Sequence, residues 1–338
     1  MAKKVPTIVD VAKLANVGTM SVSRYFKDRT LVSEVLQERI FNAAENLDYT
    51  PNQFASSLAS QKSNIIPIYI PYLRFAAIHF MRSIHKVLKT KGYQNFLVSN
   101  DDSADESKIF RDLLRWKPQG IIVVGNIISK DIRKKLKLLN IPVVETATTN
   151  PIDLFVGVDY KKIGREMASY LINLGYSNIA FVGTSLESHS LHTSLIFQGF
   201  KDFLHENKQE INYLCNFTED KKDSIVANNK SPGSEALRTI LLENKGTEVV
   251  VYADDLFALD AHIYCKNHGI NIGKDLSLVT FGGTFNEIRE VEPSITTIEI
   301  DYKKIGAKAA EILERKINRK KVQRFNYINY EFIKGKSS

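Results

Sequence analysis

The sequence predicts a small all-helical head followed by a larger α/β core built from two parallel-sheet halves. The head is indicated by apolar residues at helical spacing within about the first fifty residues. The core is indicated by apolar strand-like runs that alternate with helical patterns from Ile65 onward, which is typical of parallel sheets covered on both faces. This alternation restarts at Phe155, so we expect two Rossmann-like subdomains in series.

The first helix of the head should begin at Ile8. Thr7 and Asp10 form a carboxylate version of the capping box, and apolar residues then recur on one face. Asn16 and Gly18 interrupt this pattern, so a short turn should follow the helix.

Two more helices are expected after this turn. One starts near Thr19, with Val22 and Phe26 pointing inward. The next has Ser33 as its N-cap. Its apolar stripe consists of Leu36, Ile40, Ala44 and Leu47.

The outward face of the second helix carries small hydroxyl side chains and one arginine. Thr19 lies near Ser23, and Met20 near Arg24, through i,i+4 spacing. Residues 1–31 contain six Lys and Arg against two Asp, a net charge of +4. Such a face suits DNA phosphates and base edges, which favours a helix-turn-helix over a three-helix bundle without a nucleic-acid role.

Residue types also recur at fixed spacing across the head. They are Thr-Ile-x-Asp-Val-Ala-x-x-Ala-x-Val at 7–17, Ser-Val-Ser-Arg at 21–24, Val-Ser at 32–33 and Tyr-x-Pro-Asn at 49–52. This pattern closely resembles the DNA-binding head of the LacI/GalR repressor family. The resemblance implies a homodimer on a pseudo-palindromic double-stranded DNA operator, because a single head makes few phosphate contacts.

The resemblance also implies which residues contact DNA. Thr19, Met20 and Arg24 would lie at base-contacting positions, and Ser21 and Ser23 at phosphate-contacting ones. A hinge helix would follow at 52–59, with Leu58 as an apolar wedge in the minor groove. The complete predicted set is Thr7, Gly18, Thr19, Met20, Ser21, Ser23, Arg24, Lys27, Asn52, Ala55 and Leu58.

Three residues depart from the family pattern. Gly18 stands where the family often has Ser, so a capping hydroxyl should be missing from the second helix. Ser56 replaces an Arg that many members carry in the hinge. Met20 forms no bidentate bond with adenine, so we expect it to contact a thymine methyl or no base.

The core elements follow from the alternating pattern. Strands are expected at 65–70, 94–98, 120–124, 141–146, 178–182, 213–215, 248–252, 276–281 and 325–333. Helices are expected at 79–91, 105–116, 129–139, 160–174, 194–205, 234–242 and 256–268.

These elements give three segments, which are the head at 1–50, the hinge and linker at 51–62, and the effector-binding and dimerisation core at 63–338. The family resemblance implies a core like that of periplasmic binding proteins, in which the chain crosses between subdomains three times. It places 63–160 plus 292–321 in subdomain 1, and 161–291 plus 322–338 in subdomain 2.

One seven-residue segment of the core is nearly repeated. Val-Asp-Tyr-Lys-Lys-Ile-Gly at 158–164 recurs as Ile-Asp-Tyr-Lys-Lys-Ile-Gly at 300–306. Each copy ends a strand-like run and should start a helix capped by Asp159 or Asp301. We favour this structural role over phosphate binding by the lysines.

The composition is that of an ordinary globular protein, with 43% hydrophobic and 25% charged residues. No apolar run approaches the length of a membrane span, and no signal-peptide core follows the first lysines, so we expect a cytoplasmic protein without a membrane partner. Two cysteines are too few for a disulfide framework or a cysteine zinc site. The net charge of +8 suits a polyanion partner.

A small molecule should bind between the subdomains, beyond the carboxyl ends of the strands. The family resemblance assigns Asp255 to a ligand-contacting motif, whereas its local role would be the N-cap of a helix from Leu256. The predicted effector site consists of Arg74, Phe75, Asn126, His189, His192, Ser194, Asp255 and Gly282.

This site departs from the sugar-binding pattern of the family. Ser194 replaces an Arg that grips sugar hydroxyls, and two carboxylates are lost, one of them where Gly282 stands. Arg74 appears in the loop after the first strand, which favours an anionic ligand. Short matches resemble the gluconate-repressor branch, so we expect a sugar acid such as gluconate. A neutral sugar, a nucleoside or a sugar phosphate is the alternative effector.

Two other classes of protein fit less well. A solute-binding protein of a transporter would need a signal peptide and no helix-turn-helix. An enzyme is disfavoured because the sequence lacks a dinucleotide fingerprint, a Walker loop, a nucleophile elbow and a metal-spaced histidine cluster. We therefore expect a ligand-responsive repressor without a metal or cofactor.

Overall fold

The computed structural model describes residues 5–51, 63–71, 75–99, 105–125, 127, 129–148, 150–184, 186, 192–228 and 230–338. The chain divides into two compact units, 1–63 and 64–338. The first unit is the head and the second is the core. The predicted hinge helix at 52–59 lies outside the described residues.

The head consists of α1 (Ile8–Ala15), α2 (Thr19–Lys27), the 3-10 turn η1 (Arg29–Leu31) and α3 (Glu34–Asn46). These bounds confirm the three predicted helices. Val11, Val22 and Ile40, one from each helix, are fully buried and meet in the centre of the head. Tyr25 is also buried and contacts Phe26 edge-on, so α2 contributes an inward residue that the sequence reasoning missed.

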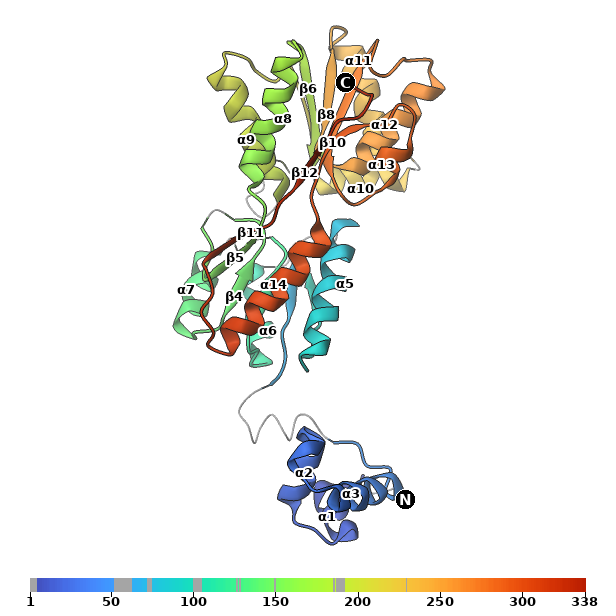
Figure 1. Ribbon diagram of the computed structural model, residues 1–338. Coiled ribbons are helices and arrows are strands. Elements are labelled where there is room, and N and C mark those ends of the chain that lie inside the picture. Colours follow the sequence, from blue (N-terminus) through green and yellow to red (C-terminus); the bar gives the residue numbers. More distant parts are fainter. Residues whose placement is uncertain are drawn as a thin grey trace. The chain divides into compact units, whose positions relative to one another are not determined.

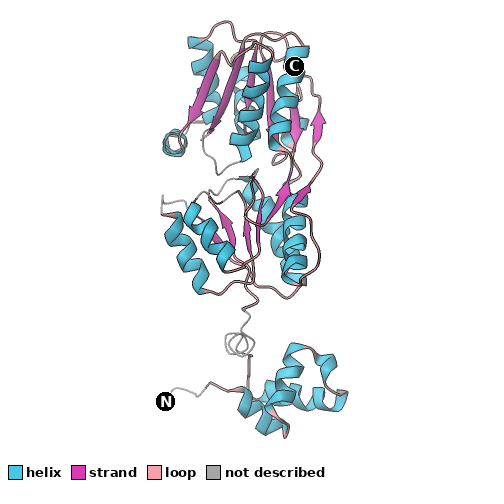
Figure 2. Ribbon diagram, turned by 90° about the vertical axis from the view of Figure 1, so that its left-hand side faces the viewer, coloured by secondary structure: helices cyan, strands magenta, loops and turns pink. Residues whose placement is uncertain are grey.

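The first sheet of the core has the strand order β11-β5-β4-β3-β1-β2, and every neighbouring pair is parallel. Its strands are β1 (Ile68–Ile70), β2 (Leu97–Ser99), β3 (Ile121–Val123), β4 (Val143–Glu145), β5 (Leu154–Gly157) and β11 (Phe325–Tyr327). Figures 1 and 2 show α5 (Phe75–Thr90) and α14 (Tyr302–Ile317) on one face, and α6 (Glu106–Arg115) and α7 (Lys130–Leu138) on the other.

The second sheet has the order β12-β10-β9-β8-β6-β7, and only the pair β10–β12 is antiparallel. Its strands are β6 (Ile179–Thr184), β7 (Tyr213–Phe217), β8 (Val249–Tyr252), β9 (Ser277–Gly282), β10 (Thr296–Glu299) and β12 (Glu331–Ile333). Figure 1 shows α8 (Tyr160–Asn173) and α9 (His192–Glu206) on one side of this sheet. On the other side lie α11 (Pro232–Glu243) and α12 (Asp255–Asn267), with the shorter α10 (Glu219–Ala227) and α13 (Glu287–Glu290) completing the subdomain.

Two of the expected subdomain bounds need correction. Because β10 pairs with β9, residues 292–300 belong to the second sheet, although they were assigned to subdomain 1. Because β11 pairs with β5, residues 322–328 belong to the first sheet, although they were assigned to subdomain 2. The expected single strand at 325–333 is in fact two strands. Both halves of this run are strand-like, so its pattern does not reveal that the chain changes sheets between them.

The repeated segment confirms the predicted helix starts. Asp159 and Asp301 are the N-caps of α8 and α14, and each carboxylate accepts a hydrogen bond from the third residue after it, at 3.0 and 2.8 Å. Each copy lies where the chain passes from a strand of one sheet to a helix of the other subdomain. The two copies therefore form two of the three crossings of the core.

Candidate functional site

The head presents an exposed polar surface on α2. Thr19, Met20, Ser23, Arg24 and Lys27 are exposed, and Ser21 is half-buried. Because Val22 and Tyr25 anchor the opposite side of this helix in the core of the head, the outward set is held on a rigid element. This arrangement has the geometry of a recognition helix, with a cation and hydroxyl groups on one face.

Side chains fix both ends of α1, whereas the start of α2 has no side-chain cap. Thr7 and Asp10 form the predicted capping box, in which the Thr7 N–H donates to the Asp10 carboxylate at 2.8 Å and the Asp10 N–H donates to the Thr7 hydroxyl at 3.4 Å. Arg39 of α3 donates to the carbonyls of Ala15 and Asn16 at 2.6 and 2.9 Å, which satisfies the end of α1. Gly18 is the N-cap of α2 and supplies no side-chain hydrogen bond, as its sequence position predicted.

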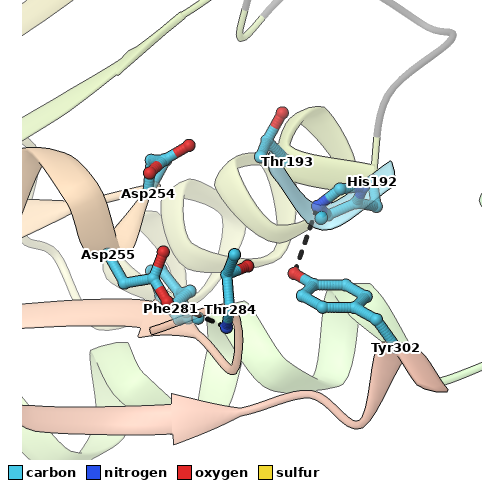
Figure 3. A pocket seen from close by; sticks show the side chains of 10 residues that line it. His192, Thr193, Asp254, Asp255, Phe281, Thr284 and Tyr302 are labelled. Carbon is cyan, nitrogen blue, oxygen red and sulfur yellow. Dashed lines mark hydrogen bonds between the residues drawn. The ribbon is translucent and has the colours of Figure 1, made fainter. Parts of the chain in front are cut away.

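A pocket lies in the core at the carboxyl ends of β8 and β9, where the amino ends of α5, α9, α12 and α14 converge (Figure 3). Its polar side chains come from two sides. Asp254 and Asp255 lie on one side, and His192, Thr193 and Tyr302 on the other. The full lining is Ala76, His192, Thr193, Ala253, Asp254, Asp255, Phe281, Gly282, Thr284 and Tyr302.

Asp255 is a buried carboxylate that is 3% exposed. Its Oδ2 accepts hydrogen bonds from the backbone N–H groups of the three residues after Gly282, at 3.3, 3.0 and 3.1 Å. Burial, and secondarily the charge of Asp254, raises the pKa of Asp255 to about 7. The group is therefore substantially protonated at neutral pH and can donate as well as accept a hydrogen bond in the pocket.

The N-cap role expected for Asp255 belongs instead to Asp254, and this corrects the sequence interpretation. The Asp254 carboxylate accepts from the N–H of Leu256 at 2.9 Å, and α12 begins one residue earlier than expected, at Asp255. Because Asp254 caps the helix, Asp255 is available to hold the loop after β9.

Gly282 makes this placement of Asp255 sterically feasible. A Cβ at position 282 would lie 2.5 Å from Asp255 Oδ2 and 2.7 Å from its Cγ. The loss of a side chain here, noted in the sequence as a departure from the sugar-binding pattern, therefore has a structural consequence. The carboxylate of Asp255 occupies the space that a side chain at 282 would need.

His192 lies between two equivalent tyrosines of the repeated segment. Its ring is 5.5 Å from that of Tyr160 and 5.7 Å from that of Tyr302, and the Tyr302 hydroxyl lies 3.4 Å from His192 Nε2. Both tyrosines are buried. The Tyr160 hydroxyl and the neighbouring Thr193 hydroxyl have no hydrogen-bond partner among the described residues.

The structure brings together three of the predicted effector residues, His192, Asp255 and Gly282. Ser194 is buried on α9 and does not line this pocket. The predicted residues Arg74, Asn126 and His189, together with Asn52, Ala55 and Leu58 of the hinge, lie outside the described residues, as does the side chain of Phe75.

Sequence reasoning missed Thr193, Thr284 and Tyr302. Tyr302 carried a signal, because the repeated segment places it at the start of a helix that follows a crossing strand. Thr193 and Thr284 carried none that distinguishes them from other loop threonines. Within the described residues, no group of side chains has the arrangement of a metal site, and no helix could cross a membrane.

A head with a recognition helix and a core with a pocket between two α/β subdomains define a class of protein, the ligand-responsive DNA-binding regulator. The chain belongs to the LacI family of bacterial regulatory proteins. The family model for the lacI-type DNA-binding region matches residues 7–52, and the model for the periplasmic binding protein-like domain matches residues 168–338, half of the chain. The predicted family, fold class and DNA-binding role are thereby confirmed.

Relatives align over nearly the whole chain. Catabolite control protein A of Staphylococcus xylosus is 26% identical over 328 residues, which cover 95% of each chain. The HTH-type transcriptional regulator GntR of Escherichia coli K12 is 26% identical over 330 residues, 94% of this chain and 93% of that protein. A lac repressor dimer bound to operator and the anti-inducer ONPF has the same fold, with a TM-score of 0.83, 21% identity and 99% coverage of both chains.

Proposed function

We propose that this protein is a homodimeric repressor of carbohydrate metabolism genes whose hold on its operator is controlled by an effector in the core pocket. The observation that carries the DNA-binding part is the exposed face of α2, where Thr19, Met20 and Arg24 stand together on a helix anchored by buried residues. The similar fold of a lac repressor dimer on its operator supports a dimeric assembly.

We infer that the effector is a sugar acid such as gluconate. The two ends of such a molecule need different partners, and the pocket offers both kinds. Hydroxyl groups can bond to Asp254, Asp255 and the threonines, because carboxyl and hydroxyl groups serve as donors and acceptors. The acid group suits His192 and the converging helix amino ends. Arg74, which the sequence predicts as a partner of an anion, lies outside the described residues.

Two carboxyl groups in the pocket would repel an anion if both were charged. The raised pKa of Asp255 removes much of this repulsion, since a protonated carboxyl donates a hydrogen bond to a carboxylate. The relatives leave the effector open, because proteins of two different names match at the same identity. The proposal of a sugar-acid effector is supported by the resemblance to the gluconate-repressor branch and by the chemistry of the pocket.

The test of the effector is thermal unfolding of the full chain with gluconate, neutral sugars, nucleosides and sugar phosphates. A ligand at a hundred times its Kd should stabilise the protein by about 2.7 kcal/mol. We expect gluconate to raise the Tm, Arg74→Ala to abolish this rise, and the control Arg82→Ala on α5 to retain it. A rise with neutral sugars alone, or one unchanged in Arg74→Ala, would contradict the anion site.

The test of DNA binding is selection from a random duplex library. We expect enrichment of a pseudo-palindrome by the wild type and relaxed base preference in Arg24→Ala, because a lost base contact changes specificity more than a lost phosphate contact. The absence of any enriched sequence would overturn the repressor assignment whatever the ligand screen shows.

A further inference from the structure

The two halves of the core carry opposite net charge. Residues 64–158 and 301–328, which form the first sheet and its helices, contain 23 Lys and Arg against 11 Asp and Glu, a net of +12. The remaining core residues contain 15 Lys and Arg against 21 Asp and Glu, a net of −6. The excess of positive charge in this protein thus belongs mainly to one subdomain.

Within that subdomain, cations gather at one edge. The helices that connect parallel strands run opposite to them, so all four helices end at the amino edge of the first sheet. We call the exposed cations at or just beyond these helix ends the basic edge. They are Lys89, Lys91, Arg115, Lys117, Lys135, Lys137, Arg315, Arg319, Lys320 and Lys321.

Cations are common at the carboxyl ends of helices, because the helix dipole favours positive charge there. The second subdomain controls for this effect, since its helices end in the same way. The last turns of α8, α10 and α11 contain no basic residue, and those of α9, α12 and the four-residue α13 contain one each, which are His205, Lys266 and Arg289. By contrast, α5, α6, α7 and α14 all have Lys or Arg in the last turn. Helix capping therefore does not account for the basic edge.

The part of this edge that follows α14 carries the most concentrated positive charge. Arg115 pairs with Asp112 at 3.1 Å, but within the described parts of the chain no ion pair involves Arg319, Lys320 or Lys321. Residues 315–324 contain six cations and no acidic residue. A DNA duplex carries condensed counterions, and cations that neutralise its phosphates release these counterions, which drives binding.

We propose that the basic edge is a second DNA-contacting surface, which binds duplex phosphates without reading sequence. This inference rests on the proposed function. The chain enters the core at this edge, where Gln119 donates its N–H to the carbonyl of Ile65 and Ile66 donates to Gln94. The segment that connects the head to this point is at most about 40 Å long when fully extended. DNA held by the head is therefore at high local concentration near the basic edge.

The shape of the edge also favours DNA over an acidic protein. The cations are spread along a six-stranded sheet, a width of about 24 Å, rather than gathered in a pocket. A duplex presents one negative charge per about 1.7 Å of its axis, so several phosphates fall within that width. Contacts of this kind raise affinity and association rate for any sequence and leave the choice of operator to α2.

The test measures how the affinity of the full chain for a random-sequence duplex depends on salt. The test variant combines Arg319→Gln, Lys320→Gln and Lys321→Gln. The matched control combines Lys245→Gln, Lys266→Gln and Lys274→Gln, three exposed cations of the second subdomain. Both variants lose the same formal charge, so a difference between them reports position. Thermal unfolding of both variants checks that the substitutions leave folding intact.

We expect the test variant to reduce the slope of log K against log salt by about 2 to 3, since each phosphate contact contributes about 0.9. Its affinity at low salt should fall at least about tenfold below that of the control. Equal slopes in the two variants would overturn the proposal. The basic edge would then face solvent or bind an acidic protein instead of DNA. A wild type that fails to bind the duplex even at low salt would instead contradict the proposed function.

Discussion

Asp255 shows how one residue shapes both the pocket and its pH response. Its carboxyl holds the loop after β9 through three backbone N–H groups while lying in the wall of the pocket. The three bonds favour the charged form, whereas burial opposes it, and burial prevails in raising the pKa. The same carboxyl is therefore a structural acceptor and a titratable group at physiological pH.

This balance predicts a pH-dependent stability. The pKa of Asp255 rises from an ordinary 3.8 to about 7 on folding, so the native state binds the proton more tightly. Its contribution to stability is fully present below pH 4 and is lost as the pH rises through 7. Relative to Asp255→Asn, the wild type should lose on the order of 2 to 4 kcal/mol between pH 5 and pH 8. Denaturant unfolding across this range checks the prediction, and parallel curves would contradict it.

At this scale the sequence predicted the site in part. Asp255 and His192 follow from the family resemblance and the loop positions, because side chains at the carboxyl ends of parallel strands converge. The interaction between Asp255 and Gly282 does not follow, since it depends on the start of α12 and the end of β9, 27 residues apart, approaching so closely that a Cβ at 282 would lie 2.5 Å from Asp255 Oδ2. Residue type alone does not reveal such an approach.

The stability of α2 depends on the residue that caps its amino end, which is Gly18. Gly18 caps it in an extended conformation, with φ −73° and ψ 149°, and a Cβ built there meets no atom within 4 Å. Nothing in the structure requires a glycine at this position. The recognition helix consequently begins without the side-chain acceptor that Ser would supply.

Gly18→Ser should therefore stabilise the head. At an N-cap, Ser is more favourable than Gly by a few tenths of a kcal/mol, because its side-chain oxygen accepts a hydrogen bond from the first turn of the helix. Gly18→Ala lacks this acceptor, and Ala is a poorer N-cap residue than Gly, so this variant should destabilise the head by up to about 1 kcal/mol. We expect the order Ser above wild type above Ala for the Tm of the head, measured by circular dichroism of the full chain. Equal Tm values for Ala and Ser would show that the hydroxyl does not cap α2.

Among the elements, the helices follow from the sequence more closely than the strands. A capping residue and an apolar stripe define a start and a face, and α1, α3 and α8 begin where these signals place them. The exceptions are α10, whose described side chains are mostly exposed and form no apolar stripe, and the four-residue α13. The run at 325–333 was misjudged because its partners lie on different sheets, and strand partners are not encoded locally.

On the scale of the whole molecule, the two copies of the repeated segment form two similar crossings between the subdomains of the core. Gly164 packs against the backbone of α9, and Gly306 packs against that of α5, so each copy fixes a pair of helices. The tyrosines that precede these glycines both contact His192. Their environments nevertheless differ, because Tyr302 lines the pocket and Tyr160 does not.

This difference predicts opposite outcomes for one substitution made at two equivalent positions. Tyr160→Phe removes a buried hydroxyl that has no partner among the described residues, so it should be neutral or stabilise the core by about 1 kcal/mol. Tyr302→Phe removes the hydroxyl that faces His192 and should cost up to about 1 kcal/mol. The Tm of each variant, measured with and without gluconate, provides the check.

The ligand response should separate the two variants further. Tyr302→Phe should weaken the rise in Tm produced by gluconate, because a pocket hydroxyl is lost, and Tyr160→Phe should preserve it. If both variants lost the gluconate-induced rise in Tm equally, both tyrosines would contribute to the ligand site. The inference that only Tyr302 does so would then be wrong. A loss confined to Tyr302→Phe would place the effector against the second crossing, where a strand of one sheet leads directly into a helix that covers the other.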